Sequence, residues 1–178
     1  MKNERHVFIL LTRHTDSFSQ LILALIQGYY SHASIGFDEE KGRFYSFTRR
    51  GFHDEEPEKI CQKRHNVPCV LYKIPVSHQA YDSMRSHLEH HYKGRGGWKY
   101  NIVGVFLGIL KFPFLRRSNK RFCSQFVAEV LKVGNEVYLH KRSSVVFPDD
   151  FTKVRLAEPA FLGTLEGLTK RTLRQRIP

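Results

Sequence analysis

Residues 29–37 carry the feature that most constrains the fold, a regular alternation of apolar with small or polar side chains. Ala33, Ile35 and Phe37 fall two positions apart, and His32 begins the intervening set. Side chains of an extended chain point alternately to opposite faces of a sheet, so this spacing predicts a strand with one buried face. His32 then lies near the start of that strand.

The other segments predict an antiparallel sheet with helices. Residues 38–42 are charged, contain a glycine and suit a hairpin turn, and the aromatic run at 43–48 supplies the partner strand. Further strands are expected at 7–12, 67–75 and 154–165, helices at 17–26, 77–92 and 125–133, and a short helical turn at 148–151. The charged stretch 49–66 is predicted to be a loop or lid, 94–97 a flexible connection, and 100–110 a helix or a hydrophobic surface element.

This order of elements predicts an α+β fold, an antiparallel sheet or half-barrel with helices packed on one side. The length of 178 residues, 41% of them hydrophobic, favours one compact domain spanning residues 1–178. The basic residues 170–178 are expected to form a flexible tail at its end.

A net charge of +12 would attract anions such as nucleic acid or the surface of an anionic membrane. The basic residues cluster at 116–121 and again at 170–176. A solvated basic surface explains this pattern equally well, and no nucleic-acid-binding motif is present, so no specific nucleic acid is expected. The apolar residues 102–114 beside the first cluster would suit peripheral contact with an anionic membrane, although a core helix fits them too.

Three cysteines, Cys61, Cys69 and Cys123, cannot all pair within one chain. An odd count without a secretory signal predicts a reducing, cytoplasmic setting. Seven residues separate Cys61 from Cys69, a spacing unlike that of zinc ligands, so no metal and no cofactor are expected.

Cys123 stands at the predicted start of the helix at 125–133. The unpaired N–H groups at a helix N-terminus stabilise a thiolate, so a thiol placed there becomes a better nucleophile at neutral pH. The same N–H groups can hold the oxyanion of a tetrahedral intermediate. A small buried cysteine is the plain alternative.

His32 changes the balance between these two interpretations. A thiol nucleophile needs an imidazole within hydrogen-bonding reach to take its proton and return it to the leaving group. His32 sits in a strand pattern among small side chains, whereas most of the other histidines lie in polar helical or loop settings. The sequence therefore predicts a cysteine-hydrolase site made by Cys123 and His32.

Three short motifs, "YSHASIG" at 30–36, "FYSF" at 44–47 and "FCSQFVA" at 122–128, resemble the circularly permuted papain-like hydrolases. These form a branch of the NlpC-type superfamily that includes YiiX-like proteins and, more distantly, lecithin retinol acyltransferase. In the permuted members the histidine strand precedes the cysteine helix, as it does here. The resemblance spans roughly residues 7–151 and implies that Cys123 is the nucleophile and His32 the base.

The resemblance also implies a third polar residue that orients the imidazole. Ser46 occupies the matching position, where YiiX-like relatives tend to carry a carboxylate. A main-chain carbonyl or an acidic residue of the following loop (Asp54, Glu55 or Glu56) could take its place.

Substrate contacts are expected from Tyr45, Gln125 and Ser34. Tyr45 also suits the hydrophobic core, and Gln125 also suits an exposed helix surface.

The predicted function is thus a thiol hydrolase or acyltransferase that forms an acyl-enzyme from an amide, ester or thioester. The resemblance implies peptide-like or lipid-like acyl substrates. The alternative is a non-catalytic module of the same fold that binds an anionic or membrane-surface partner.

Overall fold

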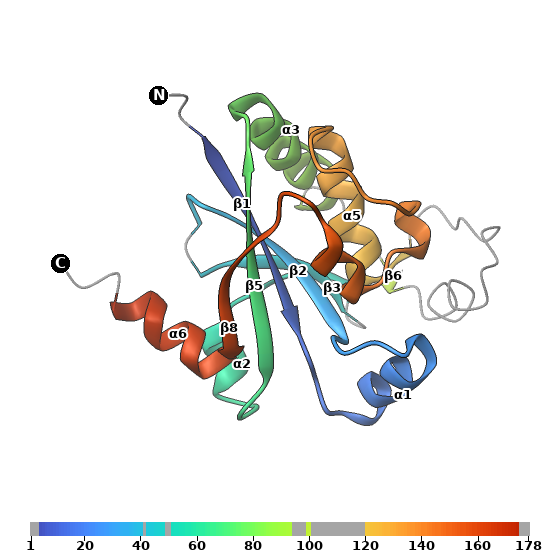
Figure 1. The fold of residues 1–178 in the computed structure, drawn as a ribbon, viewed down its shortest axis with the longest axis vertical. Coiled ribbons are helices and arrows are strands. Elements are labelled where there is room, and N and C mark those ends of the chain that lie inside the picture. Colours follow the sequence, from blue (N-terminus) through green and yellow to red (C-terminus); the bar gives the residue numbers. More distant parts are fainter. Residues whose placement is uncertain (1–3, 41, 49–50, 94–98, 101–119, 175–178) are drawn as a thin grey trace.

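The computed structural model describes residues 4–40, 42–48, 51–93, 99–100 and 120–174 of the chain. A six-stranded antiparallel sheet in the order β4-β3-β2-β1-β5-β8 forms its centre. The sheet is open, with β4 and β8 as its edges (Figure 1). Its strands are β1 (Arg5–Thr12), β2 (His32–Phe37), β3 (Phe44–Thr48), β4 (Gly51–Glu55), β5 (Pro68–Val76) and β8 (Glu158–Thr164). The predicted α+β class with an antiparallel sheet is confirmed.

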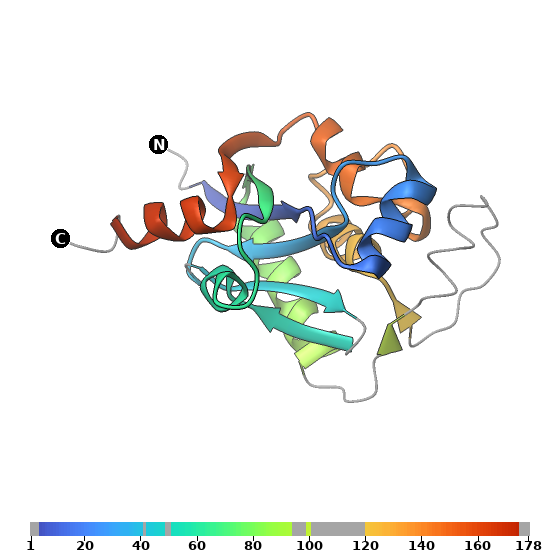
Figure 2. The ribbon, with the colours of Figure 1, turned by 90° about the horizontal axis from the view of Figure 1, so that it is seen from below.

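The helices pack on both faces of the sheet. They are α1 (Ser17–Ile26), α2 (Pro57–Cys61), α3 (His78–Leu88), α5 (Cys123–Gly134) and α6 (Leu165–Arg174). A π-helical turn η1 (Glu89–Lys93), two 3₁₀ turns η2 (Ser143–Val145) and η3 (Pro148–Lys153), and a small parallel pair β6 (Lys99–Tyr100) and β7 (Lys120–Arg121) complete the elements. Figures 1 and 2 show α2 and α6 lying together, away from α3 and α5.

The alternation within β1 explains why both faces are covered. Ile9 and Leu11 belong to the main core beneath α3 and α5, while Leu10 belongs to a smaller cluster with Leu165 and Leu168 of α6. Because apolar side chains point to both faces, each face needs a helix to exclude water. The prediction of helices on one side only was therefore wrong.

Two further predictions need correction. Residues 49–66, expected as a loop or lid, contain strand β4 and helix α2. Gly51 supports the reversal from β3 into β4 with a positive φ of 94°, and Pro57 begins α2. β4 is an edge strand with a charged solvent side, which masked its alternation in the sequence.

The basic tail expected from residue 170 begins inside α6, which extends to Arg174 and packs through Leu165 and Leu168. The apolar spacing of this helix was missed because its basic residues dominate the sequence. The connection at 94–97 and residues 101–110 of the apolar run lie outside the described residues. No helix within the described ranges is long and apolar enough to cross a membrane.

The packing of α5 can be tested at Phe126, which is fully buried among the rings of Phe47, Phe52 and Tyr92. Phe126→Ala is expected to lower the free energy of unfolding by about 3–5 kcal/mol, through lost apolar burial and the cavity left behind. Chemical denaturation followed by circular dichroism measures the change. Val133→Ala, at a position 39% exposed on the same helix, is the control and should change it by less than about 1 kcal/mol. Equal effects of the two substitutions would contradict this packing.

Candidate active site

Cys123 is the first residue of α5, after an N-cap residue, Phe122, that has extended backbone and no side-chain cap. A fully buried apolar stripe packs the helix into the main core: Phe126, Val127, Val130 and Leu131. Ser124 fixes its first turn, because its hydroxyl donates to the carbonyl of Val146 at 2.7 Å. The thiol-bearing residue is only 5% exposed.

His32 is the first residue of β2 and pairs with Thr12 at the end of β1. The chain entering β2 is anchored by Asp149 of η3, whose carboxylate accepts hydrogen bonds from the backbone N–H groups of Tyr29 and Tyr30 at 3.1–3.4 Å. A Cβ at position 28 would lie 2.4 Å from a carboxylate oxygen of Asp149, so a larger residue than Gly28 would displace this carboxylate. These contacts fix the backbone that carries the imidazole. Figure 1 shows the start of β2 near the β6 end of α5.

Glu55, the last residue of β4, holds the ring of His32. The His32 Nε2 lies 2.9 and 3.0 Å from the two carboxylate oxygens of Glu55. Their side chains are only 11% and 9% exposed, respectively. With Nε2 bonded to Glu55, the ring also interacts with Cys123, which contributes to the raised pKa of His32. The described structure therefore brings Cys123, His32 and Glu55 together from three separate elements.

The electrostatics of this group follow from burial and charge together. Burial alone would lower the pKa of His32, but attraction to Glu55 and Cys123 outweighs it and raises the pKa well above 6.5. Burial alone would raise the pKa of Glu55, but the neighbouring charge and hydrogen bond of His32 lower it. The arrangement favours an imidazolium held between a carboxylate and a thiol.

His14, two residues beyond the end of β1, lies beside the pair. Its ring centroid is 5.6 Å from that of His32, and its Nε2 is 3.1 Å from the hydroxyl of Thr12. Burial and the adjacent charge of His32 lower the pKa of His14 to about 4. Its Nδ1 is buried without a hydrogen-bond partner among the described residues. His14 is therefore a neutral ring at neutral pH.

A cavity of about 510 Å³, here called the histidine cavity, opens at this group. It is lined by His14, His32, His53, Glu55, Lys59 and Lys63, among others. Its size lies within the roughly 300–1,000 Å³ typical of ligand pockets. Cys123 is not among the lining residues, so His32 and Glu55 form the accessible part of the group.

Ser46 does not make the contact expected of it. Its hydroxyl is fully buried and donates to the carbonyl of Ala33 at 2.7 Å, so it ties β3 to β2. The carboxylate at the ring is Glu55, one of the acidic alternatives, and it comes from an edge strand rather than a loop. The register explains the difference, because Ser46 pairs with His53 and leaves the next inward position of β4 to Glu55.

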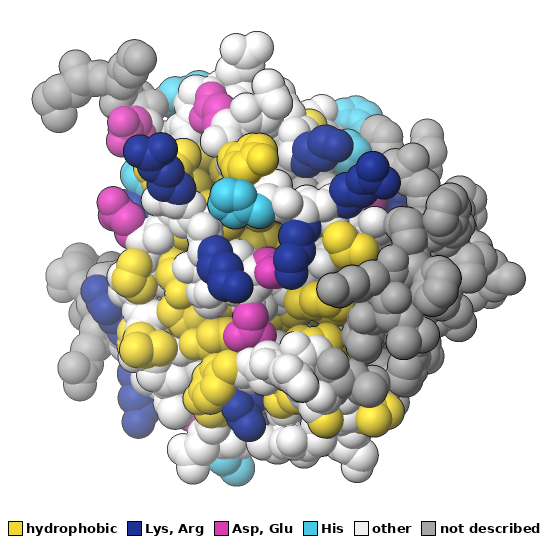
Figure 3. Space-filling model, turned by 45° about the vertical axis from the view of Figure 1, so that its right-hand side comes forward, with side chains coloured by type: hydrophobic (Ala, Val, Ile, Leu, Met, Phe, Trp, Pro, Cys, Tyr) yellow, Lys and Arg dark blue, Asp and Glu magenta, His cyan; other side chains and the backbone are white. Residues whose placement is uncertain are grey.

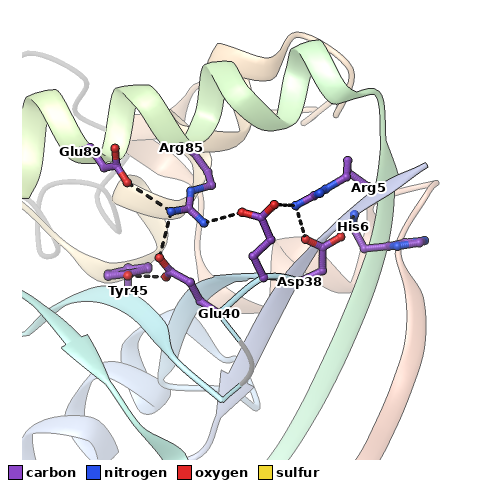
Figure 4. A network of polar contacts seen from close by, with 8 residues as sticks. Arg5, His6, Asp38, Glu40, Tyr45, Arg85 and Glu89 are labelled. Carbon is purple, nitrogen blue, oxygen red and sulfur yellow. Dashed lines mark hydrogen bonds and ion pairs between the residues drawn. The ribbon is translucent and has the colours of Figure 1, made fainter. Parts of the chain in front are cut away.

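The three residues expected to contact substrate lie elsewhere than on the wall of the histidine cavity. Tyr45 is buried in the main core and donates to Glu40, as Figure 4 shows. Gln125 is buried and donates to Glu129 one helical turn on, at 3.0 Å. Ser34 is buried, and its hydroxyl has no partner in the part of the chain that the structure describes.

Sequence reasoning missed His14. The available signal was its position two residues after Thr12, which continues the alternation of β1 on the face that pairs with His32. The cysteines other than Cys123 lie apart from the site: Cys61 is partly buried, Cys69 is buried, and both are free. Burial raises the pKa of Cys69 to about 12. Within the described ranges, no group of three or more His, Cys, Asp or Glu side chains could hold a metal ion.

No protein-family model and no curated protein matches this chain.

The ion pair predicts a pH dependence that can be measured residue by residue. Histidine NMR titration should show His32 keeping its proton well above pH 6.5, and His14 losing its proton near pH 4. Glu55→Gln removes the negative charge and should move the His32 titration downward. The raised pKa of His32 stabilises the folded protein. This contribution is complete below the pKa of about 6.5 that the histidine has in the unfolded chain, and it is lost as the pH rises through the higher pKa in the folded protein. Glu55→Gln should therefore flatten the stability profile on that alkaline side.

Asp54→Asn is the matched control, because Asp54 is the neighbouring exposed carboxylate of β4 and pairs with Arg43. It should leave the His32 titration in place. A His32 titration at or below 6.5 in the unaltered protein would contradict the assigned pair.

Proposed function

We propose that the chain is a cysteine-dependent hydrolase or acyltransferase of the circularly permuted papain-like kind. The observation that carries the proposal is His32, whose Nε2 is bonded to Glu55 and whose ring interacts with Cys123. The order of histidine strand before cysteine helix, the open antiparallel sheet and the three motifs also support it.

The proposed chemistry begins with a thiolate on Cys123, which the protonated imidazole of His32 stabilises by charge attraction. The sulfur attacks an acyl carbonyl, and the unpaired N–H groups at the start of α5 donate hydrogen bonds to the developing oxyanion. His32 passes its proton to the leaving amine, alcohol or thiol as the bond to the acyl carbon breaks. Water or another acceptor then gives its proton back to His32 and releases the acyl group from Cys123.

Glu55 positions the ring in this scheme. A carboxylate on Nε2 selects the orientation that presents Nδ1 to sulfur and stabilises the imidazolium. The proposed substrate is an amide, ester or thioester. As the resemblance implies, its acyl group is peptide-like or lipid-like. The apolar residues 102–114 and the basic residues 116–121 would suit a membrane substrate, and of these only Lys120 and Arg121 are among the described residues.

One observation favours a second candidate, the non-catalytic binding module. Cys123 is 5% exposed and does not line the histidine cavity. Lys and Arg side chains, however, are spread over the face seen in Figure 3 with Asp and Glu between them, and form no single anion-binding patch there. The contacts of the His32 ring with Glu55 and Cys123 make the enzyme the first candidate.

Two reagents test the proposal, p-nitrophenyl acetate as a substrate and iodoacetamide as an alkylating probe. Cys123 should form an acetyl-enzyme visible by intact mass, and Cys123→Ala should abolish both it and the burst of nitrophenol. His32→Ala should slow acylation by about 10²–10⁴-fold, because the imidazolium that stabilises the thiolate and protonates the leaving group is lost. The acylation rate of Glu55→Gln should fall between those of the unaltered protein and His32→Ala.

Ser46→Ala is the matched control, because its hydroxyl faces Ala33 and should not affect the acylation rate. Cys61, which is free and partly buried, is the internal reference for alkylation. Alkylation of Cys123 no faster than that of Cys61, with no acetyl-enzyme, would support the binding module instead.

A further inference from the structure

A second cavity lies on the opposite face of the sheet from α3 and α5 and takes no part in the proposed chemistry. It has a volume of about 440 Å³, within the roughly 300–1,000 Å³ range of ligand pockets. Its walls come from the sheet, the start of α2 and α6. It is called the α6 cavity here.

The α6 cavity has an apolar interior. Phe8, Phe44, Leu71 and Leu168 contribute to its lining and belong to the smaller hydrophobic cluster or pack against it. Gly36 lets the ring of Phe44 lie flat on β2, since a Cβ at that position would come within 2.9 Å of the ring. Such a wall would bury the apolar body of a ligand and place aromatic faces beside it.

The charged side chains of the α6 cavity are mostly acidic, in contrast with the chain's net charge of +12. Among the described residues, its lining holds one cation, Arg43, and four carboxylates: Asp38, Glu40, Glu56 and Glu58. This local excess of negative charge favours a cation and disfavours an anion.

The four carboxylates differ in how far they are already engaged. Asp38 lies 2.9 Å from Arg5, and Glu40 lies 3.1 Å from Arg85, as part of the network in Figure 4. Glu56 is paired with Lys59 at 2.9 Å. Glu58 is exposed and makes no ion pair with any described residue. Glu58 is thus the carboxylate that remains for a ligand.

We propose that the α6 cavity is a binding site for an organic cation with an apolar, preferably aromatic, body. The apolar body fills the space between Phe44, Leu71 and Leu168, and the ammonium group reaches the rim at Glu58. Aromatic rings of the wall add cation–π attraction. This site is independent of the proposed chemistry at Cys123.

The test uses three indoles of similar shape and different charge, titrated into the full chain by isothermal calorimetry. Tryptamine, the cation, should bind about 10-fold more tightly than the neutral tryptophol, and indole-3-acetate should bind most weakly. Backbone NMR shifts should map to β1, β3 and α6. Equal binding of all three, or binding of the anion in preference, overturns the proposal.

Two variants separate the effect of the Glu58 charge from the effect of the cavity volume. Glu58→Gln should reduce the affinity for tryptamine by about 3–10-fold and leave tryptophol unchanged, because only the charge is lost. Thr172→Trp should abolish binding of both, since the larger side chain fills the cavity from α6. Asp82→Asn on α3, an exposed carboxylate beneath the other face, is the control and should bind as the unaltered protein does.

The two cavities adjoin at Glu56, which lines both. Protein alkylated at Cys123 or carrying His32→Ala should therefore be titrated as well. Unchanged tryptamine affinity in these forms places the ligand in the α6 cavity and makes the result independent of whether Cys123 is catalytic. Loss of affinity in them, with NMR shifts at His14 and His53, would place the indole in the histidine cavity and contradict the proposal.

Discussion

The packing of α5 across β2 and β3 is the interaction on which the candidate site depends. Phe126, Val127 and Val130 are completely removed from water, so the helix cannot slide or rotate without exposing them. That restriction carries through to the first turn, where Ser124 is tied to Val146 and Cys123 faces the start of β2. Hydrophobic burial far from the sulfur thus sets the position of the sulfur.

The ion pair of His32 and Glu55 is largely buried, although burying charged groups is usually unfavourable. Removing two charged groups from water is unfavourable, and a well-packed apolar pair of similar volume is often as stable or more so. Stability alone therefore gives little reason to keep this pair at an edge of the core. Orientation of an imidazole is a sufficient physical reason, because a carboxylate on Nε2 leaves Nδ1 free for a reaction partner. The neutral ring of His14 beside it avoids a second positive charge in the same space.

Much of the fold could be predicted because it follows from local patterns. Asp16 and Ser77 cap the predicted helices α1 and α3, and the pattern at 29–48 predicted the β2–β3 hairpin. β4, α2 and α6 were missed for a common reason. Each is short or rich in charge, and each is defined by what it packs on rather than by its own periodicity.

The site was predictable only in part, for a related reason. Cys123 and His32 are marked by their own helix and strand, so their meeting could be anticipated from sequence. The identity of the third residue depends on the register between β3 and β4, where a shift of one position changes which side chain faces the ring. That register turns Ser46 toward Ala33 and presents Glu55 to His32, and nothing in the local sequence specifies it.

The segment from Glu55 to Cys61 connects the two cavities physically. Glu55 ends β4 at the imidazole, Glu56 lines both cavities, and α2 then packs against α6. Because the backbone from Glu55 to Pro57 is continuous and α2 is a single short helix, a displacement of α2 has few ways to be absorbed before it reaches the carboxylate on His32. Glu56, the residue that directly follows the orienting carboxylate, is thus part of the wall of both cavities. The position of the imidazole consequently depends on how α2 and α6 pack, as well as on the core beneath α5.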